Sequence, residues 1–380
     1  MTSRKGPIVL DLRDVGLNHR GVARALREIG TRLLLLDPGR YRAVCSAVSL
    51  PLLHGIDSGR LTVVSKHSQA VFEQVTLPMI ATRLRASAVY SHRECGALWG
   101  PPLLLHVTED PEIRWSREPM RLIAPDGKIG REIARRGYSR LVMNRALRRA
   151  RVVTSTHVTA EDLERSHHLP AERVTVVPLG VNLEQFRPLG HAASGEVPYL
   201  FHLSSNDPRE NTPVVIQAFA QLIEHTAEPI RLVVAGDLGS LRHSLVELVT
   251  DLGLDGKVET PGRVSDESLV KLYSGAVATV LTSMNEGFGL QTLEAMACGS
   301  LLVSTPARAT REIAAEADVE WTPLESTQMA QAFEVVWKDR ARQNRAAITN
   351  RRVASRFSWD ATAERLHELL NEIAQGDPQG

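Results

Sequence analysis

The sequence predicts an α/β chain built from two doubly wound domains. Short apolar runs alternate with stretches whose apolar residues recur every three or four positions, which is typical of buried parallel strands joined by helices. This alternation occurs on both sides of a small, polar stretch at residues 189–198, whose composition is typical of linkers. The length of 380 residues also fits two domains better than one.

The first half of the chain contains the first run of alternating elements. Its clearest helical pattern follows the first strand, at residues 21–36. Strands are expected at residues 7–13, 41–49, 87–92, 102–110 and 151–156. Residues 1–190 are therefore predicted to form an N-terminal Rossmann-like domain.

The second half repeats the pattern more regularly. Strands are expected at residues 198–204, 230–237, 276–283 and 300–305, and helices at residues 212–226, 240–253, 266–275 and 290–298. Residues 191–357 are predicted to form a C-terminal Rossmann-like domain. Residues 358–380 should form an amphipathic helix that crosses back to the first domain and ends in a frayed tail.

The composition indicates a globular protein of the cytoplasm. Hydrophobic residues make up 43% of the chain and charged residues 23%, which argues against disorder. Its three cysteines are scattered and lack C-x-x-C spacing, so neither a disulfide framework nor a zinc site is indicated. The start lacks a secretory signal, and no stretch is apolar enough to span a membrane. The expected location is the cytoplasm, at most peripheral at the inner membrane face.

The net charge of +1 hides an asymmetry between the halves. Residues 1–190 hold 29 Lys and Arg against 18 Asp and Glu, which leaves 16 against 26 for residues 191–380. The two halves are expected to face different partners.

The stretch "EGFGLQTLEA", residues 286–295, carries the clearest chemical signal. It lies between a predicted strand and a predicted helix, where ligands bind in open α/β sheets and where helix N–H groups favour anions. Gly287 and Gly289 allow close approach of the backbone. Glu286 and Glu294 could then accept hydrogen bonds from sugar and ribose hydroxyls. The plainer interpretation, a tight turn with one solvated acid and one acid at a helix start, stays open on the pattern alone.

With its flanks, "SMNEGFGLQTLEAMACGSLLVST" resembles the E-x7-E signature of family 4 glycosyltransferases. The likeness extends over nearly the whole chain, and the order and spacing of its pieces make it specific. The other matching segments are residues 6–29, 72–80, 101–110, 173–188, 199–222, 231–237 and 357–366.

The resemblance implies a GT-B fold, with two Rossmann-like domains facing each other across a cleft. It implies a retaining transferase that moves a sugar from a nucleoside diphosphate sugar, UDP favoured and GDP next. The acceptor would be a hydroxyl of a glycan, a lipid-linked sugar or a natural product, held mainly by the N-terminal domain. No metal and no other cofactor are expected. Catalysis would rest on positioning and on stabilising the diphosphate leaving group.

The resemblance also assigns roles to residues. Glu286 would contact the donor sugar and Glu294 the ribose, while amides of Phe288, Gly289 and Leu290 would face the sugar or the diphosphate. In the first half, His106 would lie near the reacting hydroxyl, although a histidine at a strand end is more often structural. Gly21 is expected in the first β–α loop, near phosphate or acceptor, with Arg24 beside it; a simple turn glycine is the alternative.

One segment, "SSNDPREN", departs from the pattern. Relatives carry an Arg and a Lys that neutralise the diphosphate, and Ser205 and Glu210 occupy those positions here. Arg209 and Arg263 are the nearest candidates to replace them. The N-terminus of the next helix, capped by Asn211 or Thr212, could also face phosphate.

The stretch at residues 128–151 is the most basic part of the chain. It is predicted to be a helix whose charges are either simply solvated or in weak contact with an anionic membrane or acceptor. Its single aromatic residue, Tyr138, argues against stacking with nucleic acid. Two alternatives to the transferase stay open: a GT-B protein that binds a sugar nucleotide or glycan without transfer, and a GT-B epimerase.

Overall fold

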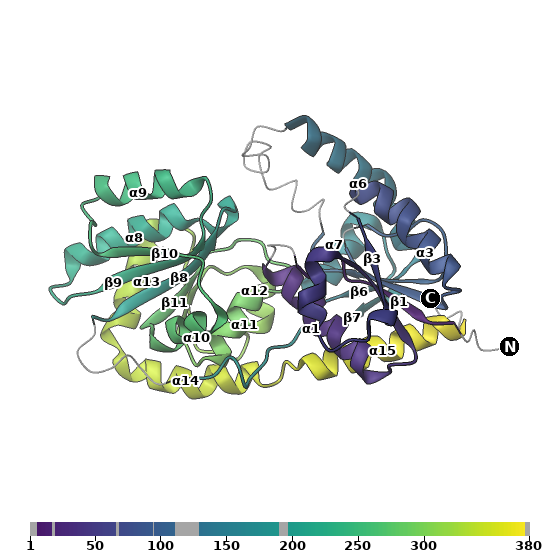
Figure 1. The fold of residues 1–380 in the computed structure, drawn as a ribbon. Coiled ribbons are helices and arrows are strands. Elements are labelled where there is room, and N and C mark those ends of the chain that lie inside the picture. Colours follow the sequence, from purple (N-terminus) through teal and green to yellow (C-terminus); the bar gives the residue numbers. More distant parts are fainter. Residues whose placement is uncertain are drawn as a thin grey trace. The chain divides into compact units, whose positions relative to one another are not determined.

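The computed structural model describes residues 6–16, 20–65, 68–93, 95–110, 129–189 and 197–376. Most of the predicted linker at 189–198 lies outside these residues, as does Lys128. The chain divides into two compact units. Figure 1 labels many of their helices and strands. Unit 1 is Met1–Gly180 with Trp359–Gly380, and unit 2 is Val181–Ser358.

Unit 1 is built on a parallel sheet in the order β3-β2-β1-β4-β5-β6-β7. The strands are β1 (Ile8–Asp11), β2 (Tyr41–Ser46), β3 (Leu61–Val64), β4 (Ala88–His92), β5 (Leu103–Val107), β6 (Arg151–Thr154) and β7 (Val174–Val176). The helices are α1 (Arg20–Leu36), α2 (Gln69–Val71), α3 (Leu77–Arg83), α6 (Ile129–Arg149), α7 (His157–His167) and α15 (Trp359–Gln375), with a π-helical turn, η3 (Phe72–Thr76), between α2 and α3. Every residue of β1, β4 and β5 is buried, which explains their continuous apolar runs.

The C-terminal helix α15 packs within unit 1. Tyr41 of β2 forms a hydrogen bond of 2.7 Å with Nδ1 of His367, and the Thr362 hydroxyl donates to the Pro178 carbonyl at 2.7 Å. Arg151 forms an ion pair with Glu372 at 2.8 Å. Residues at the end of the chain therefore complete the first unit.

Unit 2 is a second parallel sheet, in the order β10-β9-β8-β11-β12-β13. The strands are β8 (Tyr199–Ser205), β9 (Arg231–Asp237), β10 (Val258–Gly262), β11 (Ala278–Leu281), β12 (Leu302–Ser304) and β13 (Val319–Trp321). The helices are α8 (Thr212–His225), α9 (Leu241–Asp251), α10 (Asp266–Gly275), α11 (Leu290–Ala297), α12 (Arg308–Ile313), α13 (Ser326–Lys338) and α14 (Arg340–Ala354). Apolar faces of α8 and α13 pack with the central strands into one core.

Unit 2 begins at Val181, whereas the sequence predicted the boundary after residue 190. The Val181 N–H donates to the Phe357 carbonyl at 3.2 Å, and Arg351 donates to the Phe186 carbonyl at 3.4 Å. These bonds tie residues from Val181 onward to unit 2.

Both sheets reverse their strand order at the same relative place. In unit 1 the reversal lies between β1 and β4, and in unit 2 between β8 and β11. At such a switch point the loops after the two strands diverge and leave room for a ligand. The predicted class of two doubly wound α/β domains is confirmed, and it directs attention to these two places.

Candidate functional site

A small pocket lies at the switch point of unit 2. The loop after β8 contains a 3₁₀ turn, η5 (Pro208–Glu210), and the loop after β11 leads into α11. The walls include Glu210, Leu281, Thr282, Ser283, Glu286, Gly289, Gln291, Thr292, Ser304 and Thr310. The "EGFGLQ" stretch thus lies where an open α/β sheet binds its ligand.

The turn into α11 depends on Gly289. Its φ of +89° lies in the left-handed region, and a Cβ there would meet the Thr292 hydroxyl at 3.3 Å. The helix begins at Leu290, and the first N–H groups of a helix have no carbonyl partner one turn before them; the Thr292 N–H already donates to the Gly289 carbonyl. Gly299, with a φ of +76°, follows the helix at its C′ position, where glycine is the usual residue.

Asn211 joins the two loops of the pocket. It stands at the N-cap position of α8, but its side chain makes no capping bond there. Instead its amide donates to the Thr282 carbonyl at 2.9 Å, and the Thr282 hydroxyl donates to the Glu210 carbonyl. These bonds fix Glu210 against the end of β11.

The pocket is acidic. The pKa of Glu210 is raised to about 8, mainly by burial and then by the charges of Glu286 and Asp207, against the lowering effects of Arg209 and of a hydrogen bond from Gln291. Burial also raises the pKa of Glu286, despite Arg209. Two carboxyl groups that both resist ionisation therefore line one small space.

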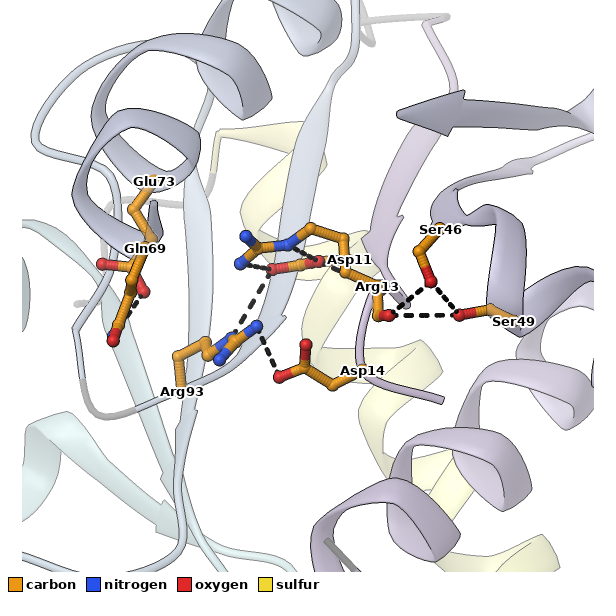
Figure 2. A network of polar contacts seen from close by, with 8 residues as sticks. All are labelled: Asp11, Arg13, Asp14, Ser46, Ser49, Gln69, Glu73 and Arg93. Atoms are coloured by element: carbon orange, nitrogen blue, oxygen red, sulfur yellow. Dashed lines mark hydrogen bonds and ion pairs between the residues drawn. The ribbon is translucent and has the colours of Figure 1, made fainter. Parts of the chain in front are cut away.

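A polar cluster of different composition occupies the switch point of unit 1. In Figure 2 the Arg13 guanidinium lies on the Asp11 carboxylate, with N–O distances of 3.0 and 3.1 Å. Arg93, just after β4, lies 2.5 Å from Asp14 and 3.9 Å from Asp11. Asp11 is only 3% exposed, so the pairing is largely shielded from water.

Glu73 extends this cluster from η3. It is 1% exposed and accepts hydrogen bonds of 2.9 Å from Gln69 and from the Tyr138 hydroxyl. Burial raises its pKa to about 7. No motif in the sequence marked this cluster; the available signal was the charged residues Arg13, Asp14 and Arg93, which follow the apolar runs of β1 and β4.

Comparison with known proteins finds a similarity for the second half of the chain. Residues 190–353 match the family described as glycosyl transferases group 1. We call this matched segment the group 1 region. The group 1 region contains the whole acidic pocket.

Named relatives extend the likeness over more than half of the chain. A D-inositol 3-phosphate glycosyltransferase of Thermobispora bispora is 32% identical over 241 residues, which are 59% of this chain and 56% of that protein. An MMP alpha-(1->4)-mannosyltransferase of Mycolicibacterium hassiacum is 26% identical over 214 residues, 54% of this chain and 48% of that protein. The chain spans about half the length of the curated relatives it matches.

Solved structures resemble the chain over nearly its full length. HepE of Anabaena in complex with UDP-glucose has a TM-score of 0.73 at 18% identity, with 97% of this chain and 100% of that one covered. Sucrose-phosphate synthase of Thermosynechococcus elongatus has a TM-score of 0.77 at 16% identity, with 97% and 99% covered. The fold is GT-B, as the resemblance implied.

The two arginines expected to replace the missing cations both have acidic partners. Arg209 forms a bidentate pair with Asp207, with a closest distance of 2.7 Å. Arg263 pairs with Asp237 at 2.7 Å at the end of β9. Ser205, at the end of β8, accepts a hydrogen bond from the Asp207 N–H. Neither arginine brings surplus positive charge to the group 1 region while it is paired in this way.

The other predicted residues of the group 1 region lie around the start of α11. Phe288 is buried and packs edge to face against Phe357, with ring centroids 6.0 Å apart. Leu290 is the first helical residue, and Glu294 lies one turn further on, 6% exposed. Phe288 thus anchors the turn through its side chain, which leaves its backbone as the group to face a ligand.

His106 is fully enclosed in unit 1. It lies on β5, its Nδ1 bonds to the Tyr90 hydroxyl and its Nε2 to the Ser155 hydroxyl, each at 2.9 Å. Burial lowers its pKa well below the ordinary value. The half-buried residues that follow the strand are Thr108 and Glu109. Both ring nitrogens thus have partners inside unit 1, and the role near the reacting hydroxyl that the resemblance implies stays a prediction.

The expected position of Gly21 in a loop is wrong. α1 begins at Arg20, so Gly21 and Arg24 lie in its first turns. The apolar pattern at residues 21–36 agrees with the observed helix to within one residue, whereas the loop position implied by the resemblance does not. Gly21 is exposed.

The predicted basic helix is α6. Its exposed residues include Arg140, Arg145 and Arg148, together with Ile133 and Leu141, which are 55% and 69% exposed. None of the helices within the described residues combines the length and apolar character needed to cross a lipid bilayer. Nor do three or more His, Cys, Asp or Glu side chains among those residues gather so that they could hold a metal ion.

Proposed function

We propose that the protein is a retaining glycosyltransferase that moves a sugar from a nucleoside diphosphate sugar to a hydroxyl group. The observation that carries this proposal is the pocket at the β8/β11 switch point, which joins Glu286 to the start of α11 within the group 1 region. UDP is the favoured donor base, with GDP next, and the UDP-glucose complex of the structurally similar HepE supports this order. No metal and no other cofactor take part.

The donor is held by groups with complementary chemistry. N–H groups at the start of α11, from Gly289 and Leu290, donate to the diphosphate. Glu286 accepts hydrogen bonds from sugar hydroxyls and Glu294 from the ribose. Glu294 is almost completely buried, which fits a hydrogen-bonding role better than the role of a solvated charge.

Transfer is driven by positioning and leaving-group stabilisation. As the glycosidic bond to the diphosphate breaks, negative charge grows on the leaving oxygen, and the fixed amides of the turn stabilise it. That oxygen takes the proton of the incoming hydroxyl, which attacks the same face of the sugar. The protein contributes orientation, worth several orders of magnitude in rate.

The acceptor is a hydroxyl of a glycan, a lipid-linked sugar or a natural product. The cluster at the β1/β4 switch point is the best candidate to hold it in unit 1. Asp14 and Arg93 are partly exposed and match the paired acceptors and donors of sugar hydroxyls. The arginines of the cluster are already paired with carboxylates, which favours a neutral polyol over a phosphorylated one.

Nucleotide binding and turnover test the proposal directly. Calorimetry with UDP, GDP, dTDP and ADP should give binding to one nucleotide, UDP first, weakened about tenfold or more in Glu294→Ala. Release of UDP from UDP-glucose with a panel of acceptors should fall at least 100-fold in Glu286→Ala. Glu224→Ala, an exposed acid of α8, is the matched control and should behave as wild type. Absence of nucleotide binding would refute the proposal.

Binding without transfer is the second candidate. It is favoured by the two carboxyl groups in the pocket and by the aspartate partners of Arg209 and Arg263, because an ionised pocket repels a diphosphate. This candidate would be supported if the protein binds a nucleotide but forms no product with any acceptor. Glu286→Ala would then have no transfer activity to lose.

We also propose weak peripheral contact of α6 with an anionic membrane. Basic side chains near such a surface each add attraction, and Ile133 and Leu141 lie on the exposed face that carries the arginines. Sedimentation with anionic vesicles, but not with zwitterionic ones, should recover the protein. Equal recovery with both kinds of vesicle, or with neither, would contradict this contact.

A further inference from the structure

The side chains around Glu210 make its ionisation costly. Glu286 faces it from the loop after β11, and Asp207 lies beside it after β8. Arg209 is the cation that opposes them, but its guanidinium is held by Asp207 at 2.7 to 3.1 Å. With all four groups ionised, three negative charges would face one positive charge.

The rest of the pocket offers little to offset this charge. His202, on β8, is buried and neutral, since burial lowers its pKa to about 4. Its Nε2 is bonded to the Thr212 hydroxyl at 3.2 Å. The remaining polar wall residues are Thr282, Ser283, Gln291, Thr292, Ser304 and Thr310. A proton is therefore the simplest compensation for the two carboxyl groups.

We propose that Glu210 acts as a neutral carboxylic acid in donor binding and donates a hydrogen bond to a phosphate oxygen of the nucleoside diphosphate sugar. This inference rests on the proposed function, since it assigns a role within the same donor site. One proton, taken from solvent, stays on the Glu210–Glu286 pair for each donor bound. The protonated Glu210 then donates a hydrogen bond to phosphate at the position where a lysine would supply a positive charge. Donor binding therefore depends on pH.

The electrostatics support this assignment. A carboxylate in this pocket would repel a diphosphate, whereas the neutral acid carries a donor and no charge. An incoming anion further disfavours ionisation, so binding and protonation strengthen each other. The pKa of Glu210, about 8 before the donor arrives, means that the acid form is already abundant near neutral pH.

Gln291 positions this acid. Its side chain forms a hydrogen bond with Glu210 that lowers the pKa of the carboxyl group. Gln291 lies in the first turn of α11, next to the amides proposed to hold the diphosphate. The pair therefore places the acidic proton beside the anion-binding end of the helix.

Calorimetric titration with UDP-glucose tests the proposal. Wild type should bind without net proton uptake near pH 6, and with uptake approaching one proton above about pH 8, as measured in buffers of different protonation enthalpy. Affinity should fall towards about tenfold per pH unit above about pH 8. Glu210→Gln should bind within about threefold of wild type at pH 6.5, lose the uptake and show no such fall. Glu224→Gln should keep the wild-type profile.

Gln291→Leu provides a second, independent readout. Loss of its hydrogen bond should raise the pH at which affinity begins to fall, whatever its effect on affinity itself. Binding of UDP-glucose with a flat pH profile in wild type, or the wild-type profile in Glu210→Gln, would overturn the role of Glu210 and leave the proposed function intact. No binding of UDP-glucose to wild type at any pH would overturn both.

Discussion

The two switch points of the molecule share a position in the fold but differ in their charges. At the β1/β4 edge, carboxylates alternate with guanidiniums, so that Arg13 and Arg93 lie against Asp11 and Asp14. At the β8/β11 edge, carboxyl groups face each other in one pocket. The fold thus sets where a ligand can bind, while the loops decide whether the site is neutralised by ion pairs or by a proton.

The same kind of substitution should therefore have opposite effects at the two places. Removal of a carboxylate from a shielded ion pair leaves a cation without its partner, which is destabilising. Removal of a carboxyl group from a crowded acidic pocket relieves repulsion, which is stabilising when that group would be ionised.

The largest effect is expected for Asp11→Asn in unit 1. Asp11 is 3% exposed and holds Arg13 through two N–O contacts, so its loss should lower the free energy of unfolding by about 3 kcal/mol. Urea unfolding followed by circular dichroism measures this. Asp14→Asn, at a more exposed acid, is the matched control and should cost clearly less. A loss in Asp11→Asn below about 0.5 kcal/mol would show that the pairing does not stabilise the unit.

A smaller effect of opposite sign is expected for Glu210→Gln. The pKa of Glu210 is raised from 4.5 to about 8, so the folded protein holds a proton there that the unfolded chain releases. Wild-type stability should fall as pH rises through that interval, whereas the variant has no such proton to lose. At pH 9 the variant should be more stable than wild type by about 1 to 3 kcal/mol, with the gain absent near pH 4.

Urea unfolding at both pH values checks this second expectation. Glu224→Gln, which removes an exposed acid from α8, should change stability little at either pH. A gain that does not grow between pH 4 and pH 9 would mean that Glu210 ionises normally in the fold.

The local sequence pattern was sufficient to predict the turn and the helix that form one wall of the acidic pocket. The helix from Leu290, the turn at Gly289 and the glycine after Cys298 follow from residues within a few positions of one another. Such short-range conformational preferences can be inferred from neighbouring residue types alone. The two sheets followed as well, because buried parallel strands read as continuous apolar runs.

Contacts between distant segments could not be predicted in this way. Arg93 meets Asp11 only because β4 pairs with β1, and Gln291 meets Glu210 only because two loops share one edge of a sheet. The face on which His106 lies depends on strand register, since neighbouring residues of a strand point to opposite faces. Here the resemblance suggested a catalytic position, and the fold surrounds the ring with Tyr90 and Ser155.

The smallest effect, expected for Tyr138→Phe, tests whether unit 1 also contains a proton-bearing acid. The Tyr138 hydroxyl donates to Glu73 at 2.9 Å, and this bond lowers the Glu73 pKa against the larger effect of burial. Its loss should raise that pKa above its value of about 7 and cost about 1 kcal/mol of stability. Carboxyl NMR of protein labelled at glutamate, with Glu73→Gln to assign the signal, measures the shift. An unchanged midpoint would mean that the Tyr138 bond does not contribute to the Glu73 pKa, which burial, Gln69 and the two arginines would then set without it.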